Sequence, residues 1–441
     1  MPTAYGRILR RPGALRFSAA GLLARFPMSM VGISTILAVQ DLYGSYSAAG
    51  AVSAANIVAT AVGAPLLARL VDAHGQARVM APALVASSAS LLALAAAAQH
   101  RAAPWSLIAL SALAGALSGS MGSLVRSRWT ALLESPDDIH TAFSLEAALD
   151  ETAFMIGPVL ATVLCTTPAL PVTSGWIAAM ALQTGGGLWF LSQRATEPAP
   201  HPHPRRRRTA GPGRGDGERG AAERARGPAA PEPTPHRPVL AHGAVVSIAV
   251  IFLTSGAMFG ANDVAVVAFA TELGQKPAAG AALAAWAAGS FLAALAYGSR
   301  SWGWPLWKQL AAGALALALG ASTFTVAPNL AVLSALYALT GLAIAPTITS
   351  GNNIVQVTVA PSQLTEGLAW VSTALNIGVS LGSMVAGRVL DASGSRGGYL
   401  LVAGFAWVGA AVTAGSLRIL RRARTHSRVP LEGHPDERCE R

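Results

Sequence analysis

The sequence predicts an all-α integral membrane protein with twelve transmembrane helices in two pseudo-symmetric six-helix bundles. Hydrophobic residues make up 52% of the 441 residues and charged residues only 12%, which is typical of a polytopic membrane protein. Most of the charge lies between long apolar runs. The chain also divides into two apolar halves that resemble each other in sequence and are separated by one polar segment.

The polar segment covers residues 194–241 and consists mainly of Pro, Gly, Arg and Glu. It has no apolar periodicity, so it cannot bury enough surface to offset the entropy lost on ordering. We therefore predict a disordered basic linker here rather than a surface loop inside one domain. The predicted organisation is a first bundle (1–193), the linker (194–241), a second bundle (242–417) and a tail (418–441).

Three short matches relate the two halves at an offset of 225 to 230 residues. The matched segments are 44–51 with 274–281, 110–115 with 336–341, and Ser135-Pro136 with Ala360-Pro361. Each match alone is weak in a chain rich in Ala and Gly. Three matches in the same order indicate an internal duplication, as in transporters built from parallel repeats.

A membrane helix needs about 20 apolar residues to cross the hydrocarbon layer. In the first half we place spans at 20–40, 47–68, 79–99, 104–126, 142–165 and 172–192. In the second half we place them at 243–269, 278–298, 306–327, 330–352, 366–388 and 398–417. Gly115-x-x-x-Gly119 and Gly378-x-x-x-Gly382 would let helix backbones approach closely, unless they simply reflect Ala-rich sequence.

The net charge of +11 is confined to particular segments. The linker holds ten Arg and five acidic residues, and the tail holds seven Arg and four acidic residues. This distribution is a topology signal, and it predicts a plasma-membrane protein with both termini and the linker in the cytoplasm. It argues against nucleic acid as a partner. We expect a monomer in the lipid bilayer that handles a small-molecule substrate and protons.

The loop after the second span contains Leu70, Asp72, Gly75 and Arg78. Gly75 permits a positive φ angle, and Asp72 could cap the N-terminus of the third helix. The stretch resembles the signature loop of the major facilitator superfamily, G-x-L-x-D-R-x-G-R-R. Leu70, Asp72 and Gly75 match this pattern, and Arg78 stands in for its basic pair. Four positions depart from the pattern: Ala68 replaces the first Gly, Ala73 the first Arg, and Gln76-Ala77 the basic pair.

The six-plus-six plan, the duplication and the central linker also resemble that superfamily, so the resemblance covers nearly the whole chain. It implies transport by alternating access of two six-helix halves. It also implies that the loop at 70–78 acts as a conformational latch, which packs between the halves and steadies the outward-facing state. The second copy of this loop, at 298–303, lacks the acidic residue.

The fifth span holds three acidic residues, Glu146, Asp150 and Glu151. Glu146 and Asp150 share a helix face, whereas Glu151 points about 100° away from Asp150. Arg126 or Arg128 could neutralise Glu146 or Asp150 as a fixed ion pair. Glu151 is expected near mid-membrane, where an ionised carboxylate is costly. We therefore predict that Glu151 binds and releases the coupling protons, with Asp150 as a second candidate.

Gly157-Pro158 follows in the same span. The pair resembles the Gly-Pro centre of the fifth-helix motif common in antiporters of the superfamily, and this implies efflux by antiport. The flanking positions hold Ser144, Ala153 and Ala161 instead of the further glycines of that motif. Pro158 also frees a backbone carbonyl and bends the helix, which alone could explain its presence.

In the second half, Asp263 lies well inside the seventh span. The seventh helix of this fold borders the central cavity, so the resemblance makes Asp263 a candidate for proton or substrate binding. Pairing with Lys276 at the external end is the alternative. The repeat offset maps Arg126 onto Asn352 and Glu151 onto Asn376, which predicts that coupling belongs to the first half. Further cavity candidates are Asn262, Asn376, Asn56, Gln183, Trp286 and Arg25, although Arg25 could instead extend to the cytoplasmic face.

The leading prediction is a secondary transporter that exports amphipathic compounds in exchange for protons. The Gly-Pro pair, the intramembrane acids and the apolar walls favour this function over proton-coupled uptake of a sugar or organic acid. No G-x-x-x-x-G-K-[ST] loop occurs, so we do not expect ATP to drive transport directly. We expect no cofactor or metal. A lipid-acting membrane enzyme or a non-transporting sensor is the alternative of another class, but no nucleophile–base pair is evident.

Overall fold

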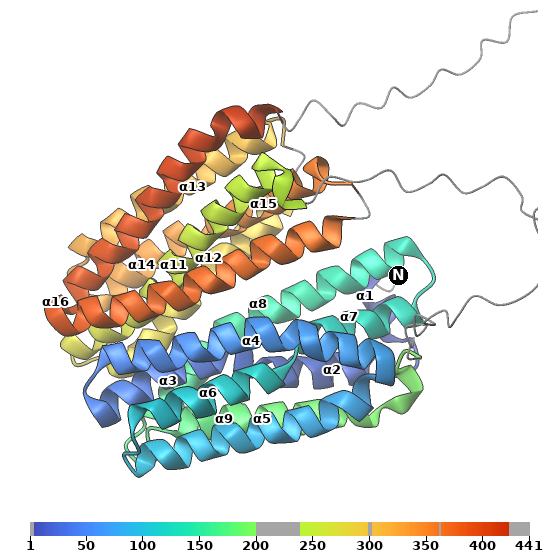
Figure 1. The fold of residues 1–441 in the computed structure, drawn as a ribbon, viewed down its shortest axis with the longest axis horizontal. Coiled ribbons are helices and arrows are strands. Elements are labelled where there is room, and N and C mark those ends of the chain that lie inside the picture. Colours follow the sequence, from blue (N-terminus) through green and yellow to red (C-terminus); the bar gives the residue numbers. More distant parts are fainter. Residues whose placement is uncertain (1–3, 200–238, 299–301, 361–362, 423–441) are drawn as a thin grey trace, which may run out of the picture.

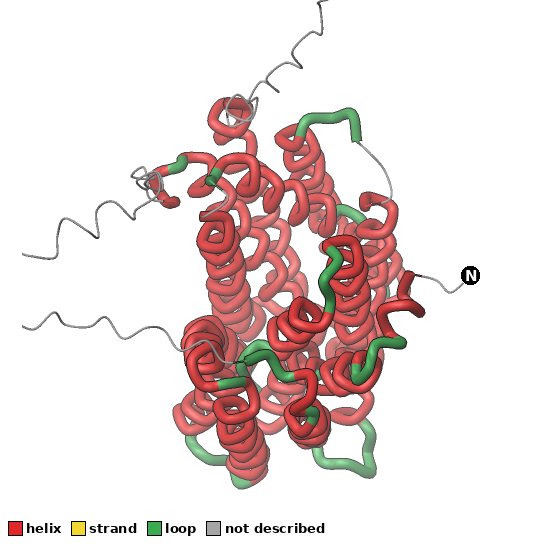
Figure 2. Tube along the Cα trace, turned by 90° about the vertical axis from the view of Figure 1, so that its right-hand side faces the viewer, coloured by secondary structure: helices red, strands yellow, loops and turns green. Residues whose placement is uncertain are grey.

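The computed structural model describes residues 4–199, 239–298, 302–360 and 363–422, and every regular element in these ranges is helical (Figures 1 and 2). The predicted disordered linker falls largely within 200–238 and the predicted tail largely within 423–441. Those parts of the two predictions lie outside the described residues, as does Pro361 of the third repeat match. At the ends of the predicted linker, Arg194–Thr196 and Val239–Ala241 form 3-10 turns, and residues 418–422 of the predicted tail continue a helix, so the ordered halves extend further than predicted.

Within residues 4–199 the structure contains nine α-helices. Two neighbouring pairs of these helices each form one predicted span. The nine helices are α1 (Ala4–Leu9), α2 (Ala14–Arg25), α3 (Pro27–Tyr43), α4 (Tyr46–His74), α5 (Gln76–Gln99), α6 (Pro104–Ser118), α7 (Met121–Leu132), α8 (Pro136–Thr166) and α9 (Ser174–Ser192). Helices α2 and α3 form the first span, and α6 and α7 form the fourth. A short 3-10 turn, η1 (Arg194–Thr196), follows α9.

The second half repeats this plan. Its helices are α11 (Gly243–Glu272), α12 (Ala279–Gly298), α13 (Leu306–Thr323), α14 (Leu330–Gly341), α15 (Ile344–Thr358) and α16 (Leu364–Arg422), with 3-10 turns η2 (Val239–Ala241), η3 (Lys276–Ala278) and η4 (Phe324–Val326). Helix α16 kinks at Gly394, whose φ is 66°, so it covers the last two predicted spans.

All twelve predicted spans therefore correspond to helices. Among the described residues, ten helical stretches are long and apolar enough to cross a membrane. One of them, Glu366–Arg422, holds two predicted spans on either side of the kink, and α9 covers the remaining one. Figure 1 draws the first half (blue to green) below the second (yellow to red). We call the end where α9 stops and α11 starts the linker end, on the right in this view, and the opposite end the far end.

Glycines set the closest helix contacts. Four of them interlock α11 and α16: Gly256, Gly260, Gly378 and Gly382. A Cβ atom at any of the four would lie 2.0 Å from a carbonyl oxygen of the facing helix, so only glycine allows this approach. The predicted role of Gly378-x-x-x-Gly382 in helix packing is confirmed.

The duplication is visible in equivalent packing. Gly115 on α6 faces the carbonyl oxygen of Asn56 on α4, and Gly341 on α14 faces that of Trp286 on α12; in both cases a Cβ atom would lie 2.4 Å away. Gly119 was expected to allow close helix packing, but it ends a helix instead. Its φ of 64° ends α6 and separates it from α7. The second half has a break at the equivalent place, between α14 and α15.

The two halves meet at the far end through α4 with α16 and α8 with α12. Asp391 on α16 accepts hydrogen bonds from the backbone N–H groups of Tyr46 (2.8 Å) and Ser47 (2.9 Å) and from the Ser45 hydroxyl (3.1 Å). This carboxylate caps the N-terminus of α4, where the free N–H groups and the helix dipole favour a negative charge. Lys276 adds an ion pair to Asp41 at 3.0 Å.

Close backbone contacts accompany these polar contacts. A Cβ atom on Gly50 of α4 would lie 2.3 Å from the carbonyl oxygen of Ser383 on α16. A Cβ atom on Gly280 of α12 would lie 2.4 Å from the carbonyl oxygen of Pro158 on α8. The far end is therefore closed by packing, an ion pair and a helix cap together.

Candidate functional site

A buried cluster of charges lies in the linker-end part of the first half, where α2, α7 and α8 meet. Arg25 at the end of α2 is only 3% exposed. Its guanidinium donates to the carboxylate of Glu146 and, at 2.7 Å, to that of Asp150. The prediction that Arg25 reaches the cytoplasmic face is therefore wrong, because two acids four residues apart on α8 hold it inside the bundle.

Three further donors complete the cluster. Arg126 on α7 pairs with Asp150 at 2.8 Å, as the sequence predicts. Glu146 accepts hydrogen bonds from the Ser18 hydroxyl at 2.7 Å and from the indole N–H of Trp129 at 2.8 Å. Two guanidinium groups thus neutralise two carboxylates, and the remaining acceptor capacity of Glu146 is used by neutral donors.

Ser18 and Trp129 were not predicted as members of this site. The residue spacing along the two helices could have identified them as members of the site. Ser18 and Arg25 are seven residues apart on α2, and Arg126 and Trp129 are three apart on α7, so each pair lies on one helix face.

Arg128 is not part of the cluster, which corrects its predicted pairing with Glu146 or Asp150. It is fully buried and donates to the side chain of Gln76 and to Gln193 and Thr196, each at 2.9 Å. Its guanidinium also stacks on the Phe190 ring at 3.8 Å. Two residues along α7 rotate the side chain by about 200°, so Arg128 faces α5 and α9 where Arg126 faces α8.

Glu151 lies midway along α8 and is half-buried. Its neighbour Asp150 is paired with two guanidinium groups, whereas Glu151 forms no ion pair within the described residues. Glu151 and Pro158 are seven residues apart and therefore lie on the same face of α8. Since Pro158 contacts Gly280 of α12, this face is directed toward the junction of the two halves.

The Gly157-Pro158 pair serves two contacts at once. A Cβ atom on Gly157 would lie 2.0 Å from the Ser29 hydroxyl oxygen, so glycine allows α8 to approach α3. The Ser29 hydroxyl in turn donates to the carbonyl of Ala153 at 2.8 Å. Pro158 faces the other half, as described above. The pair thus joins a tight contact within the first half to the contact between halves.

The second half buries hydroxyl and amide groups nearer the far end. Tyr337 donates to the Asn262 side chain at 2.5 Å and lies 3.2 Å from the Tyr399 hydroxyl. Trp286 packs edge-on against Tyr337, with 4.9 Å between ring centroids. Asp263 follows Asn262 on α11 and is half-buried.

Asp263 does not pair with Lys276, which was its alternative role, because Lys276 is bound to Asp41 and Gln40. Within the described residues Asp263 forms no ion pair. It is therefore the second half's counterpart of Glu151, an acid inside a span without a described cation.

The remaining predicted cavity residues are not brought together. Asn56 donates to the carbonyl of Ser111 at 2.8 Å, and Gln183 donates to the Ser87 hydroxyl at 2.8 Å. Both therefore join helices within the first half. Asn376 is exposed on α16. The roles of Asn56, Gln183 and Asn376 in a substrate cavity stay predictions. Asn352, onto which the repeat offset maps Arg126, is half-buried on α15.

The predicted latch loop has a different arrangement from the expected one. Gly75 has a φ of 95° and ends α4. Asp72 lies in the last turn of α4 and is exposed, as are Leu70 and Arg78. The prediction that Asp72 caps α5 is wrong: the acceptor for the Ala77 N–H at the start of α5 is the carboxylate of Glu197, at 2.9 Å. Helix α4 continues to His74, six residues further than its predicted span, and this places Asp72 inside it.

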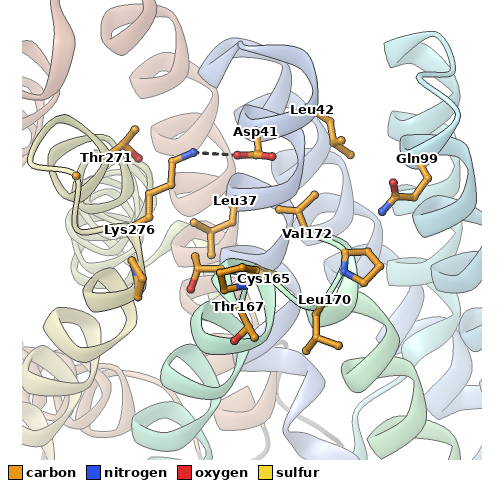
Figure 3. Close-up of a pocket in the computed structure, with 15 residues that line it drawn as sticks. Leu37, Asp41, Leu42, Gln99, Cys165, Thr167, Leu170, Val172, Thr271 and Lys276 are labelled. Carbon is orange, nitrogen blue, oxygen red and sulfur yellow. Dashed lines mark hydrogen bonds and ion pairs between the residues drawn. The ribbon is translucent and has the colours of Figure 1, made fainter.

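A cavity of about 530 Å³ opens at the far end, away from the charge cluster (Figure 3). Its lining comes from α3, the α8–α9 connection and the α11–α12 connection. None of the predicted site residues lines it.

Comparisons with known proteins agree with this architecture. The family model described as Major Facilitator Superfamily matches residues 17–295. A nucleoside transporter, NupG, superposes with a TM-score of 0.67 at 12% identity, covering 93% of this chain and 99% of that one. A bacterial homolog of the human lysosomal transporter Spinster, in an inward-facing and unoccupied conformation, gives a TM-score of 0.67 at 12% identity, with 93% and 97% covered.

The POT family transporter PepTSo gives a TM-score of 0.65 at 13% identity, with 93% and 98% covered. No curated protein matches the sequence. At these identities the solved structures establish the fold, and the family model covers more than half of the chain. The chain belongs to the Major Facilitator Superfamily, a family of membrane transporters.

Proposed function

We propose that the chain is a monomeric, proton-coupled exporter of amphipathic small molecules in the plasma membrane. The observation that supports this most is the contrast along α8. Glu146 and Asp150 are neutralised by Arg25 and Arg126, but Glu151 has no cation among the described residues. An unpaired carboxylate in a membrane span is costly when ionised, so it takes up a proton unless water or a cation reaches it. Glu151 is the proton-binding group in this proposal, and Asp263 is the second candidate.

The contacts between the halves support alternating access. Asp391, Lys276 and the glycine contacts close the far end. With the termini and linker in the cytoplasm, as the basic charge predicts, this is an inward-facing state. The similarity to an inward-facing Spinster homolog is in keeping with it. In the opposite state the loop at 70–78 would close the linker end.

The position of Gly157-Pro158 supports a coupling between Glu151 and the contact of the two halves. The pair holds α8 against α3 on one side and against α12 on the other. Glu151 is two turns away on the face that Pro158 presents to α12. A change of protonation at Glu151 is therefore placed where it can alter the contact between the halves.

The test uses proteoliposomes loaded with a pH-sensitive dye, an imposed proton gradient and a panel of amphipathic compounds. We expect at least one compound to collapse the gradient in the parent protein and Glu151→Gln to abolish that effect. Glu134→Gln, which changes an exposed acid of the α7–α8 connection, is the matched control and should behave as the parent. Equal proton movement in Glu151→Gln and the parent would contradict the role of Glu151, and Asp263→Asn would then be tested in its place.

A further inference from the structure

The far-end cavity is built by both halves of the protein. Leu37 and Asp41 of α3 and the segment 165–172 form the wall contributed by the first half. Thr271 and the segment 274–277 form the wall contributed by the second half. Figure 3 shows the Asp41–Lys276 ion pair bridging the two walls, with Cys165 and Thr167 below it. The volume, about 530 Å³, is in the range that holds a drug-sized molecule.

The polar groups of the lining offer acceptors rather than donors. The hydroxyls of Thr166, Thr167 and Thr271 each donate their proton to a backbone carbonyl at 2.7 Å, so their oxygen lone pairs remain. The side-chain amide of Gln99 donates to the Thr173 hydroxyl at 3.0 Å. Two donors of the Lys276 ammonium are directed at Gln40 and Asp41.

Asp41 is the strongest of these acceptors. Only one of its carboxylate oxygens receives Lys276, and the side chain is 49% exposed. A carboxylate can accept about four hydrogen bonds, so the second oxygen is free to bind another donor. The rest of the lining is apolar, with Leu37, Leu170, Val172 and Pro277 among it.

We propose that this cavity binds a small organic cation that carries an ammonium group on an apolar body. The ammonium donates to Asp41 and to threonine oxygens, and the body packs on the leucine, valine and proline side chains. Charge-assisted hydrogen bonds give the site its preference for a cation over a neutral molecule of the same shape. Lys276 stays on the opposite carboxylate oxygen.

Occupancy of the cavity has a consequence for conformation. Because the walls belong to different halves, the cavity is complete only while the far end is closed. A ligand that touches both walls binds this state more tightly than a state in which the halves have separated there, and it shifts the population accordingly. Binding of the cation therefore stabilises the conformation in which the far end is closed. This second step rests on the alternating access of the proposed function, whereas binding itself does not.

Binding is tested with purified full-length protein and dansylcadaverine, a fluorescent primary amine, with neutral N-pentyl dansylamide, which keeps the chain and lacks the ammonium, as the matched ligand. We expect dansylcadaverine to bind saturably and N-pentyl dansylamide to bind at least about tenfold more weakly. Asp41→Asn should weaken dansylcadaverine binding by about tenfold or more, and Val172→Trp, which fills the cavity, should abolish it. Glu134→Gln should bind as the parent.

Equal binding of the two dyes, or unchanged binding in Val172→Trp, would overturn the proposal. Val172→Trp leaves the ion pair in place, so it decides the matter even if Asp41→Asn fails to fold. Neither measurement needs a proton gradient, so failure here leaves the Glu151 assay untouched, and failure of that assay leaves the binding result untouched.

The stabilisation of the closed far end is measured with spin labels on the far ends of the two halves, at Trp105→Cys and Val326→Cys with Cys439 replaced by Ser. Both positions are highly exposed, at 72% and 77%. We expect dansylcadaverine to narrow the distance distribution and shift it to the shorter distance. If the distances between the two spin labels were longer or unchanged at saturating dansylcadaverine, the cation would not stabilise the closed far end.

Discussion

In the first half, Arg25 and Arg126 neutralise Glu146 and Asp150 inside the bundle. In the second half, Tyr337, Tyr399 and Asn262 share uncharged hydrogen bonds nearer the far end. The helices that carry these groups nevertheless follow one plan. The same plan therefore accommodates an ion-pair cluster in one half and a hydroxyl cluster at a different depth in the other, and the buried polar chemistry is not what specifies it.

Small-residue packing is what the halves have in common. Gly115 and Gly341 make the same contact at the same distance with the helix beside them. In lipid, helix association depends on close van der Waals contact. Lipid tails are as apolar as the helix surfaces, so no hydrophobic effect drives the helices together. The glycine contacts therefore hold the shared framework, and the charged cluster is a feature added to one copy of it.

The largest expected effect comes from breaking the charge cluster. Arg25→Met leaves Glu146, which is fully buried, without its cation and should lower the free energy of unfolding by about 3–5 kcal/mol. Arg25→Met combined with Glu146→Met should recover most of that loss, because an apolar pair replaces the ion pair. Thermal unfolding in detergent measures both. As a control, Arg16→Met changes an exposed residue of the same helix and should leave the melting temperature unchanged. A double variant as unstable as the single one would show that the unpaired Glu146 carboxylate does not cause the loss of stability.

The shared packing is tested by the equivalent glycines. Gly115→Ala and Gly341→Ala each place a methyl group 2.4 Å from a carbonyl oxygen and should each lower stability by about 1–3 kcal/mol. Gly185→Ala, where a Cβ atom meets nothing within 4 Å, is the control and should be near neutral. The comparison predicts equal melting-temperature shifts for the two variants. A large shift in one half only would mean that the two copies do not rely on the same contact.

A smaller effect is expected from the hydroxyl cluster. Tyr337→Phe removes the donor to buried Asn262 and should lower the free energy of unfolding by about 1–2 kcal/mol. Tyr399→Phe keeps the Tyr337–Asn262 hydrogen bond and should have a smaller effect. Heat or denaturant unfolding of the two variants under the same conditions shows which one loses more stability. The reverse order would place the main polar contact of the second half at Tyr399.

The smallest effect concerns the contact between the halves. Asp391→Asn removes the negative charge from the N-terminus of α4 and should shift the conformational equilibrium toward an open far end by roughly two- to fivefold. Spin labels at Trp105→Cys and Val326→Cys report this as a longer-distance population. Arg388→Gln, an exposed change on the same helix, should leave the distribution unchanged. No change in Asp391→Asn would mean that packing alone closes the far end.

The span positions could be predicted because hydrocarbon thickness and apolar runs determine them, and residues 110–115 and 336–341 identified the repeat. The Arg126–Asp150 pair was within reach of spacing arguments on neighbouring spans. The inward position of Arg25 was not, because hydropathy places a basic residue near a helix end without showing which way it points. Glu197 as the cap of α5 was also out of reach, since its contact with Ala77 joins segments 120 residues apart.

The break between α6 and α7 at Gly119 gives the cluster a mechanical asymmetry. Helix α2 continues into α3 through Phe26, whose φ and ψ of −51° and −38° are helical, so Arg25 is carried on an unbroken rod. Arg126 is carried on α7, a twelve-residue segment attached at a glycine pivot. A tilt of α7 about this glycine would change the Arg126–Asp150 and Trp129–Glu146 contacts and would leave the Arg25–Glu146 pair in place. Asp150 would then keep Arg25 as its cation, so the charge balance at Asp150 would depend on the position of α7.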